Sequence, residues 1–407
     1  MNVYRAAWVC PIDQPPIRDG LVQTDAGHIV AVGPADWNKP NRRFNDDDVV
    51  VDMGDVALLP GLVNAHTHLE LSWLRGRVPP ASRFTDWVKQ LVAIRRGTEQ
   101  AVTPEIVAPI REALTELQWT GTVAIGDITN SLAAIEPMQQ AGMKGVVFHE
   151  LLGFKERDGA LIESSKARRE SAAKHGLPIS LAPHAPYSTS VELFKAIRAA
   201  VNQSECPIMS VHLGESLEEV ELLERGSGPW RGMLETIGVW RDDWAIPACG
   251  PVQFLERHGL IDSSTLVVHG VQFDDEALRR LKDLGATLVT CPRSNRWVGA
   301  GYPPIERFYR SGVPVAVGTD SLASVEDLNL FSELKTMRSL APSVPARRIL
   351  ESATIVGARA LGLGHELGTL EPGKSAGMIA VKLPADVTDV EEYLLSGIEA
   401  PQIEWVV

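Results

Sequence analysis

Cysteine is scarce in this 407-residue chain, and the few cysteines lie far apart. They are Cys10, Cys206, Cys249 and Cys291, and none forms a C-x-x-C pair. This spacing argues against a disulfide framework and against a zinc site built on cysteine. Reduced thiols are typical of a cytoplasmic protein, which is the location that we expect.

Long apolar runs, a basic leader and an excess of positive charge are also missing. No run approaches the roughly 20 apolar residues of a membrane-spanning helix. The first segment, MNVYRAAWVCPIDQPPIRDG, lacks the pattern of a signal peptide. The formal net charge is −13, which disfavours a nucleic-acid partner. Hydrophobic residues make up 44% of the chain, which is ample for a large globular core.

The two ends of the chain share a pattern of short β-rich runs broken by Gly, Pro, Asp and Asn. It occurs in residues 20–35 and 49–60, and again in 367–383 and 403–407. Such runs predict small hairpins. We expect residues 1–59 and 366–407 to pair into one small β-sandwich domain.

Between the ends, short apolar runs alternate with longer amphipathic stretches. The eight runs are GLVNAH, TVAIGD, GVVFHE, ISLAPH, IMSVHL, LVVHG, TLVTCP and VAVGTD. Stretches such as VELFKAIRAAV and DEALRRLKDLG, with apolar residues three and four apart, predict helices. Buried strands that alternate with helices favour a parallel sheet. The class is therefore α/β, and eight units match a closed (β/α)8 TIM barrel over residues 60–365, with a doubly wound open sheet as the alternative.

One connection is much longer than the others and runs from about Glu215 to Leu260. It carries Trp230, Trp240 and Trp244. Long connections inside compact domains are usually functional, and the loops that follow barrel strands form the active-site face. We expect these tryptophans to form part of the wall of a pocket.

Polar residues end nearly all of the eight apolar runs. They are His66, His68, Asp127, His149, Glu150, His184, His212, His269 and Asp320. Six of the ten histidines belong to this set. In a barrel these strand ends meet on one face, where catalytic groups lie.

His66 and His68 alternate on one predicted strand, so both side chains point to the same side. The pair alone is a weak signal, because two polar residues at a strand edge would look the same. With His212 and Asp320 from other strand ends, three imidazoles and a carboxylate form a competent set for zinc, or for ferrous iron. Burial of all four without a metal would leave costly unpaired polar groups. We therefore expect one divalent metal ion, with zinc as the first choice.

Two further polar residues are candidates for proton transfer. Glu215 follows His212 by three residues, where its carboxylate can reach a metal-bound water, although a solvated loop glutamate would show the same spacing. His269 would act as a further metal ligand or as a group that orients the water. The structural alternative is a hydrogen-bonded histidine in the core. Asp320 can act as a ligand that accepts a hydrogen bond from the water, or simply cap the next helix.

Several stretches together resemble the amidohydrolase superfamily, and within it the adenosine-deaminase-like and chlorohydrolase-like branch. They are PGLVNAHTH, PHAPYS, SVHLGES, VVHG, CPRSN and VGTDSLAS. The resemblance covers nearly the whole chain. It implies a mononuclear site whose ligands are His66, His68, His212 and Asp320. It also implies Glu215 as the general acid and base, and His269 as a residue that orients the water.

The same resemblance implies hydrolytic deamination of an adenine-type nucleoside. The fourth strand ends in His184 instead of the lysine of dinuclear members, and PHAPYS is similar to nucleoside deaminases whose matching histidine holds the ribose. HTHLELS, with Glu70, and RFTDWVKQLVAIRR, with Arg83 and Trp87, look most like aminodeoxyfutalosine deaminases of menaquinone biosynthesis. We therefore expect 6-amino-6-deoxyfutalosine to be converted to futalosine and ammonia.

Two kinds of alternative remain open. Within the branch, the substrate would be S-adenosylhomocysteine, methylthioadenosine, adenosine or another aminohydrolase or chlorohydrolase substrate. From another class, the chain would be a non-catalytic metal-binding or ligand-binding protein, and a purely structural scaffold ranks last. Because members of the superfamily are often homo-oligomers, we expect a homodimer.

The substrate suggests which side chains to expect around it. Trp87 or Trp73 would stack on adenine, and Glu70 would bind the purine edge or a sugar hydroxyl. A benzoate carboxylate would pair with an arginine. The arginine candidates are Arg83, Arg225, Arg231, Arg293 and Arg296, with plain surface charge as the alternative for each. Ser321, beside Asp320, completes the expected substrate contacts, together with His184.

Overall fold

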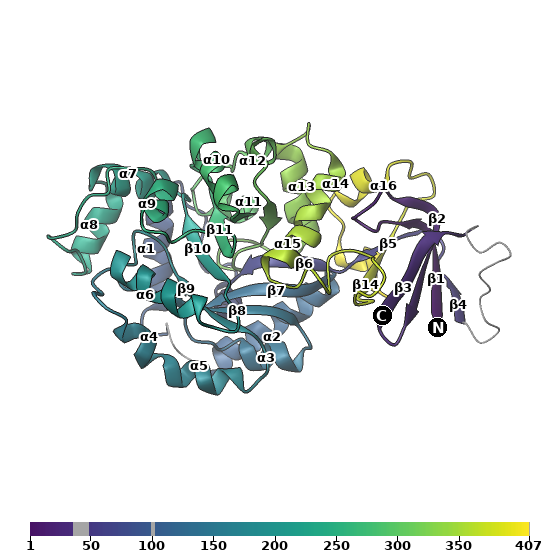
Figure 1. Ribbon diagram of the computed structural model, residues 1–407, viewed down its shortest axis with the longest axis horizontal. Helices are drawn as coiled ribbons and strands as arrows, with labels where there is room; N and C mark the ends of the chain where they lie inside the picture. The colour runs from purple at the N-terminus through teal and green to yellow at the C-terminus, as the bar shows by residue number, and fades with distance from the viewer. Residues whose placement is uncertain (36–48, 99–101, 407) are drawn as a thin grey trace.

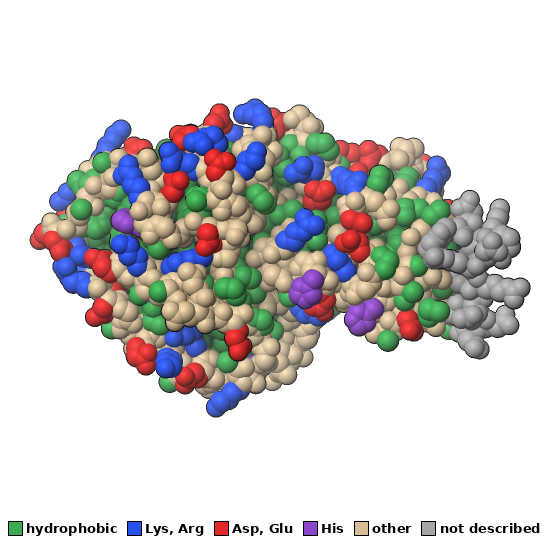
Figure 2. Space-filling view, viewed as in Figure 1, with side chains coloured by type: hydrophobic (Ala, Val, Ile, Leu, Met, Phe, Trp, Pro, Cys, Tyr) green, Lys and Arg blue, Asp and Glu red, His purple; other side chains and the backbone are tan. Residues whose placement is uncertain are grey.

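The computed structural model describes residues 1–35, 49–98 and 102–406. Figure 1 shows a larger part in which helices surround strands and, at one end of the long axis, a smaller β part that holds both chain termini. On the face drawn in Figure 2, acidic and basic side chains are interspersed, so the negative net charge is not gathered there into one patch.

The smaller part is a sheet built from both ends of the chain. Its strands are β1 (Asn2–Val9), β2 (Ile17–Asp25), β3 (His28–Pro34), β4 (Val49–Asp52), β5 (Val56–Pro60), β14 (Met378–Lys382) and β15 (Ile403–Trp405). β14 pairs antiparallel with β5 and with β15, while β1 pairs with β2, β4 and β5. The two ends therefore pair with each other, as their shared sequence pattern predicts.

The larger part contains parallel strands at all eight apolar runs. Its strands are β6 (Leu62–Thr67), β7 (Thr122–Thr129), β8 (Lys144–Leu151), β9 (Ile179–Pro183), β10 (Met209–Leu213), β11 (Thr265–His269), β12 (Thr287–Thr290) and β13 (Val315–Val317). In the described chain they form two parallel sheets, ordered β6-β7-β8-β9 and β10-β11-β12-β13. The predicted α/β fold with parallel strands is confirmed.

The two parallel sheets meet at both of their edges. At one edge, Thr67 and Asp320 form a parallel bridge between the ends of β6 and β13. At the other, the His212 backbone N–H donates to the His184 carbonyl at 2.9 Å. Buried side chains from both sheets, including Phe148, share one hydrophobic cluster. The carboxyl ends of the strands are therefore held close together.

Helices follow most of the strands (Figure 1). They are α1 (Phe84–Arg95), α2 (Pro104–Trp119), α3 (Ile135–Gln140), α4 (Ala160–Ser164), α5 (Lys166–Ala173), α6 (Val191–Asn202), α7 (Leu217–Arg225), α8 (Pro229–Thr236), α9 (Pro251–Arg257), α10 (Asp275–Leu284), α11 (Pro292–Trp297), α12 (Ile305–Ser311), α13 (Leu330–Leu340), α14 (Ala346–Ser352), α15 (Ile355–Ala360) and α16 (Val390–Leu394), with 3-10 helices η2 (Leu69–Leu74) and η3 (Ala400–Gln402). Among helices formed by described residues, none has the length and apolar character that a membrane crossing requires.

Two helices illustrate why the sequence folds in this way. α6 begins after Ser190, whose side chain accepts a hydrogen bond from the Leu193 backbone, and its apolar residues face the core. α10 begins after Asp274, which caps the helix in the same way, and ends at Gly285, whose φ of 75° is left-handed. Both helices cover the stretches predicted from apolar spacing.

The structure describes every residue of the long connection from Glu215 to Leu260. This connection contains the helices α7, α8 and α9. Trp230 is buried on α8, whereas Trp240 and Trp244 pack against Phe154 with ring centroids 5.8 and 5.7 Å apart. The segment therefore adds a packed layer beside the strand ends.

We predict that Gly318→Ala destabilises the fold at the edge between β6 and β13. A Cβ at Gly318 would lie 2.6 Å from the His66 carbonyl oxygen and 2.7 Å from the His66 Cβ, closer than side chains approach. The overpacking should cost about 1–3 kcal/mol of unfolding free energy, measured by chemical denaturation. Gly232→Ala on α8, where a Cβ meets open space, is the matched control and should not destabilise. Equal stability of the two variants would contradict the close approach.

Candidate active site

A pocket lies at the carboxyl ends of the parallel strands, and we call it the inner pocket. Its lining includes His68 after β6, His184 after β9, His212 on β10, His269 on β11 and Asp320 after β13. The sequence pattern predicted that strand ends would bring these residues together. The structure brings all five into one lining.

His66 lies beneath this lining, at the end of β6, and is fully buried. Neither of its ring nitrogens has a hydrogen-bond partner among the described residues. The His66 ring centroid lies 4.9 Å from those of both His68 and His212. A buried imidazole normally has a partner for its nitrogens, so this arrangement fits a metal ligand.

Two groups of potential ligand atoms share His66. One contains His212 and His269, and the other contains His68 and Asp320. Within each group the ligand atoms lie within 4.8 Å of one another. The Asp320 Oδ1 atom is 3.5 Å from His68 Nε2 and 3.9 Å from His66 Nε2. Imidazole nitrogens and a carboxylate oxygen are the donors that zinc prefers, so the residues fit a single divalent ion.

Burial keeps the imidazoles of this cluster neutral. It lowers the pKa of His66, His68 and His269 well below the usual value, and neighbouring imidazoles lower it further. The pKa of His212 falls to about 4, mainly because of burial. Neutral imidazole is the form that binds a metal ion.

Hydrogen bonds orient Asp320 within the cluster. Its Oδ2 atom accepts from Ser294 Oγ at 2.5 Å, and its backbone N–H donates to the His66 carbonyl at 3.1 Å. The backbone of Asp320 is left-handed with φ of 59°, and His269 has φ of 80°. Such conformations are strained for residues other than glycine and cluster at functional sites. Burial raises the pKa of Asp320 to about 6, while the Ser294 hydrogen bond opposes this.

Glu215 projects beside His269 just after β10. Its Oε1 atom lies 3.7 Å from His269 Nε2 and 3.5 Å from Asn295 Nδ2, which also contacts His269 Nδ1 at 3.0 Å. The Glu219 carboxylate fixes the turn by accepting from the Glu215 backbone N–H. Burial raises the pKa of Glu215 well above its usual value, and Asp320 adds to this effect. A buried carboxyl with a raised pKa is suited to proton exchange.

His184 lines the inner pocket and makes hydrogen bonds with two neighbouring residues. Its Nδ1 atom contacts Ser188 Oγ at 2.6 Å, and its carbonyl oxygen contacts His212 Nδ1 at 3.1 Å. The second contact requires a proton on His212 Nδ1, which leaves Nε2 of that ring as the atom available to a metal ion.

Aromatic side chains form one wall of the inner pocket. Phe84, Trp87, Tyr187 and Trp230 all line it. Tyr187 and Trp230 stack with centroids 3.9 Å apart. The indole N–H groups of Trp87 and Trp230 are buried without a partner among the described residues. Trp87 therefore lies where a stacking residue was expected. Trp73, its alternative, does not line the pocket, whereas the expected Ser321 does.

The expected role of Glu70 must be corrected. Glu70 does not line the inner pocket, and protein donors occupy both of its carboxylate oxygens. Oε2 accepts from Thr129 Oγ1, Ser131 Oγ and the backbone N–H groups of Asn130 and Ser131. Oε1 accepts from Arg95 Nη2 at 3.2 Å. Glu70 therefore fixes the loop after β7 and an arginine, and it does not lie in the lining where a substrate contact was expected.

Arg83 and Arg293 also lie outside the inner pocket. Arg83 is exposed at the start of α1, and the Arg293 guanidinium is bonded to Glu333 at 2.9 Å and Asp327 at 2.7 Å. The arginine of the inner pocket is Arg95, which our sequence reasoning missed. A signal was present: Arg95 lies eight residues after Trp87, on the same face of a helix.

Asn130 and Glu150 are further lining residues without a predicted role. Asn130 Nδ2 donates to Glu150 Oε2 at 3.1 Å. Glu150 Oε1 has no hydrogen-bond partner in the described chain and lies 3.4 Å from His212 Nδ1. Glu150 ends a predicted strand, so its position was visible in the sequence, but its function was not.

The Amidohydrolase family model matches residues 57–402. The chain is 30% identical to the 5-methylthioadenosine/S-adenosylhomocysteine deaminase of Syntrophobacter fumaroxidans over 377 residues, which cover 89% of this chain and 80% of that protein. The deaminase of the same description from Moorella thermoacetica is 28% identical over 415 residues, covering 98% and 90%.

Solved structures give the same relationship. Helicobacter pylori aminofutalosine deaminase in complex with methylthio-coformycin has a TM-score of 0.83 and 25% identity, covering 100% of this chain and 97% of that one. A zinc-bound adenosine deaminase from Xanthomonas campestris has a TM-score of 0.82 and 26% identity, covering 99% and 90%. The chain therefore belongs to the amidohydrolase family and is a hydrolase of the aminohydrolase type.

Proposed function

We propose that the chain deaminates an adenine-type nucleoside, and that 6-amino-6-deoxyfutalosine is converted to futalosine and ammonia in menaquinone biosynthesis. The observation that carries the deamination is the buried Glu215 carboxyl, 3.7 Å from His269 and beside the cluster around His66. The likeness to the H. pylori aminofutalosine deaminase supports the choice of substrate.

We propose that the two parallel sheets close into a (β/α)8 barrel over residues 60–365. The bridge between Thr67 and Asp320 and the hydrogen bond from His212 to His184, at opposite edges, support closure. Residues 1–59 and 366–407 would form the β-sandwich domain. Because strand ends converge in a barrel, this architecture accounts for the clustering of the site residues.

His66, His68, His212 and Asp320 would hold one divalent ion, with zinc first and iron as the alternative. The donor set and the unpartnered nitrogens of His66 support this assignment. When bound, such an ion acts as a Lewis acid and makes water more acidic.

The chain's own residues would move the protons. Glu215 protonates a purine ring nitrogen, which makes C6 more electrophilic. Asp320 and His269 orient the water that attacks C6, and Asp320 accepts its proton. Asp320 then delivers the proton it took from water to the amino group, and Glu215 takes the proton of the new C6 hydroxyl. The C6–N bond breaks, ammonia leaves, the oxygen remains on C6 as a carbonyl, and both carboxyl groups return to their starting protonation states.

The remaining contacts follow from the lining. Trp87 would flank the adenine, His184 would bind a sugar hydroxyl, and Ser321 would contact the base. We also propose that the protein is a homodimer and is located in the cytoplasm. The non-catalytic alternative is weakened because Glu215 accompanies a full ligand set.

A second candidate substrate is methylthioadenosine or S-adenosylhomocysteine. The 28–30% identity to deaminases of those nucleosides, over 83–98% of this chain, supports it. The triazine hydrolases among the solved structures are 20% identical and bear on the fold alone.

We predict that His66→Gln abolishes metal binding, because His66 is common to both ligand groups. Elemental analysis of purified protein should find about one divalent ion per wild-type chain and far less in the variant. His28→Gln, at an exposed histidine on β3, is the control and should keep its metal. Full metal content in His66→Gln would contradict the assigned site.

We predict that Glu215→Gln lowers kcat by about 10²–10⁴-fold, because the amide cannot carry the proton. Metal content should not change, since Glu215 is outside the proposed ligand set. Glu218→Gln, three residues along the chain, is the matched control and should retain wild-type turnover. Near-normal activity of Glu215→Gln would rule out its proposed role.

We predict that 6-amino-6-deoxyfutalosine is the preferred substrate among adenine nucleosides. Its kcat/KM, from ammonia release, should exceed those of S-adenosylhomocysteine, methylthioadenosine and adenosine by about tenfold or more. Chloride release from a chlorotriazine should be absent. A higher kcat/KM for any of the other nucleosides would replace our choice of substrate and leave the deaminase reaction in place.

A further inference from the structure

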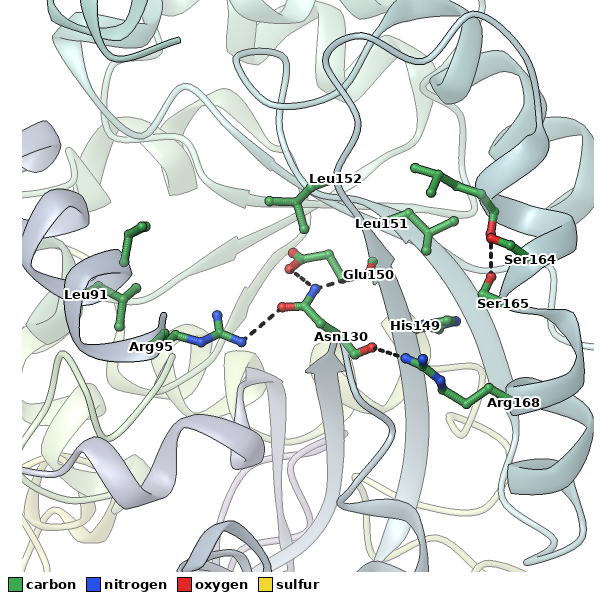
Figure 3. A pocket seen from close by; sticks show the side chains of 12 residues that line it. Leu91, Arg95, Asn130, His149, Glu150, Leu151, Leu152, Ser164, Ser165 and Arg168 are labelled. Carbon is green, nitrogen blue, oxygen red and sulfur yellow. Dashed lines mark hydrogen bonds between the residues drawn. The ribbon is translucent and has the colours of Figure 1, made fainter. Parts of the chain in front are cut away.

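A second cavity adjoins the inner pocket, and we call it the outer chamber. Its volume is about 610 Å³, within the usual range for small-molecule sites. It shares Leu91, Arg95, Asn130, Glu150 and Leu152 with the lining of the inner pocket. The two spaces therefore border on each other at these side chains, and Figure 3 shows the residues on the side of the outer chamber.

The outer chamber combines apolar walls with positive charge. Leu151, Leu152 and Leu161 contribute apolar surface, and Arg95 and Arg168 contribute guanidinium groups from α1 and α5. In Figure 3 the two arginines approach Asn130 from opposite sides. Arg95 Nη2 donates to the Asn130 side chain at 3.3 Å, and Arg168 Nη1 donates to the Asn130 carbonyl at 3.4 Å.

Arg95 is held so that part of its guanidinium faces the cavities. The side chain is 16% exposed, and of its nitrogens only Nη2 bonds to the described part of the chain, through Glu70 and Asn130. Its Nε and Nη1 groups have no hydrogen-bond partner among the described residues. The rigid fork of an arginine then offers these N–H groups to an anion in the cavity.

The acidic side chains nearby leave room for such an anion. The Glu70 oxygens are occupied by the five donors described above. Glu150 Oε2 accepts from Asn130, while Oε1 lies near His212 on the side of the inner pocket. Glu150 Oε1 is thus placed to accept a hydrogen bond from a hydroxyl between the two cavities. His149, which also lines the outer chamber, is neutral because burial lowers its pKa to about 4.

We propose that the outer chamber binds a substituent carried by the sugar of the nucleoside, with an apolar, ring-sized body and a carboxylate end that pairs with Arg95. Glu70 acts as the positioning residue for Arg95. The proposal rests on the proposed function in one respect: the adenine occupies the inner pocket beside Glu215. The apolar walls accommodate the ring, and Arg95 favours the carboxylate over a neutral end.

Three synthetic nucleosides test this assignment. They are adenosine, 5′-S-(3-carboxyphenyl)-5′-thioadenosine and the methyl ester of that acid. In the wild-type protein, kcat/KM for the acid should exceed that for the ester by about tenfold or more, as a charge-assisted hydrogen bond allows. Arg95→Met should reduce the acid-to-ester ratio to about one. Arg96→Met, at the neighbouring exposed arginine, is the matched control and should leave the ratio unchanged.

Removal of Arg95 alone takes a cation away from the buried Glu70 carboxylate and can impair folding. The double variant Glu70→Gln/Arg95→Met removes both charges and should fold, and its acid-to-ester ratio should also be about one. A double variant that retains the wild-type preference for the acid would overturn the proposal.

Binding measurements separate this proposal from the deaminase assignment. Calorimetry on Glu215→Gln protein, with and without Arg95→Met, gives dissociation constants for the acid and the ester without turnover. If no nucleoside is deaminated, the proposed function fails, and tighter binding of the acid that depends on Arg95 still supports the outer chamber. If adenosine is deaminated but acid and ester bind equally or not at all, the outer chamber assignment is overturned and the deaminase stands.

Discussion

The burial of the His66 imidazole, whose two ring nitrogens have no hydrogen-bond partner among the described residues, is the constraint on which the site depends. A buried polar group without a partner costs about 1–3 kcal/mol, so the surrounding fold must enforce its position. It does so through backbone contacts: the Asp320 N–H bonds to the His66 carbonyl, and Gly318 allows the segment after β13 to pass directly over His66. A cation bound as proposed would give these nitrogens a partner.

The same burial sets the electrostatics of the whole cluster. It moves the pKa of the histidines down and that of Glu215 up, so both kinds of group favour their neutral forms. A cluster of neutral groups in a nonpolar surrounding has little to repel a divalent cation and several lone pairs to offer it. Ser294 and Asn295, on α11, hold the carboxylates by hydrogen bonds and so keep the donors oriented. This preorganisation suits the proposed chemistry, which would use both a metal ion and a mobile proton.

Much of this arrangement was predictable, because strand ends repeat a simple pattern. Each of the eight apolar runs contains a strand, and His68, His212 and Asp320 line one pocket, as their positions at those strand ends require. Glu70 and Arg293 were misplaced for the opposite reason. A glutamate two residues after a ligand looks like part of the site, yet backbone donors of a distant loop capture its side chain. An arginine beside a motif is equally able to pair with buried acids. Long-range pairing of this kind leaves no local signal, whereas Arg95 was readable from helical spacing.

The position of Glu70 bears on the length of substrate that the two cavities would accept. Glu70 lies on the 3-10 helix that directly follows His68, and it fixes Arg95 on α1. A short stretch of backbone thus carries a proposed metal ligand and the anchor of the arginine between the two cavities. In the proposed complex, this stretch would set the distance between the reacting carbon and the substrate carboxylate. Adaptation to a longer or shorter substrate would then be easier on the opposite leucine wall than at the arginine, because a shift of Glu70 would also disturb the metal ligands.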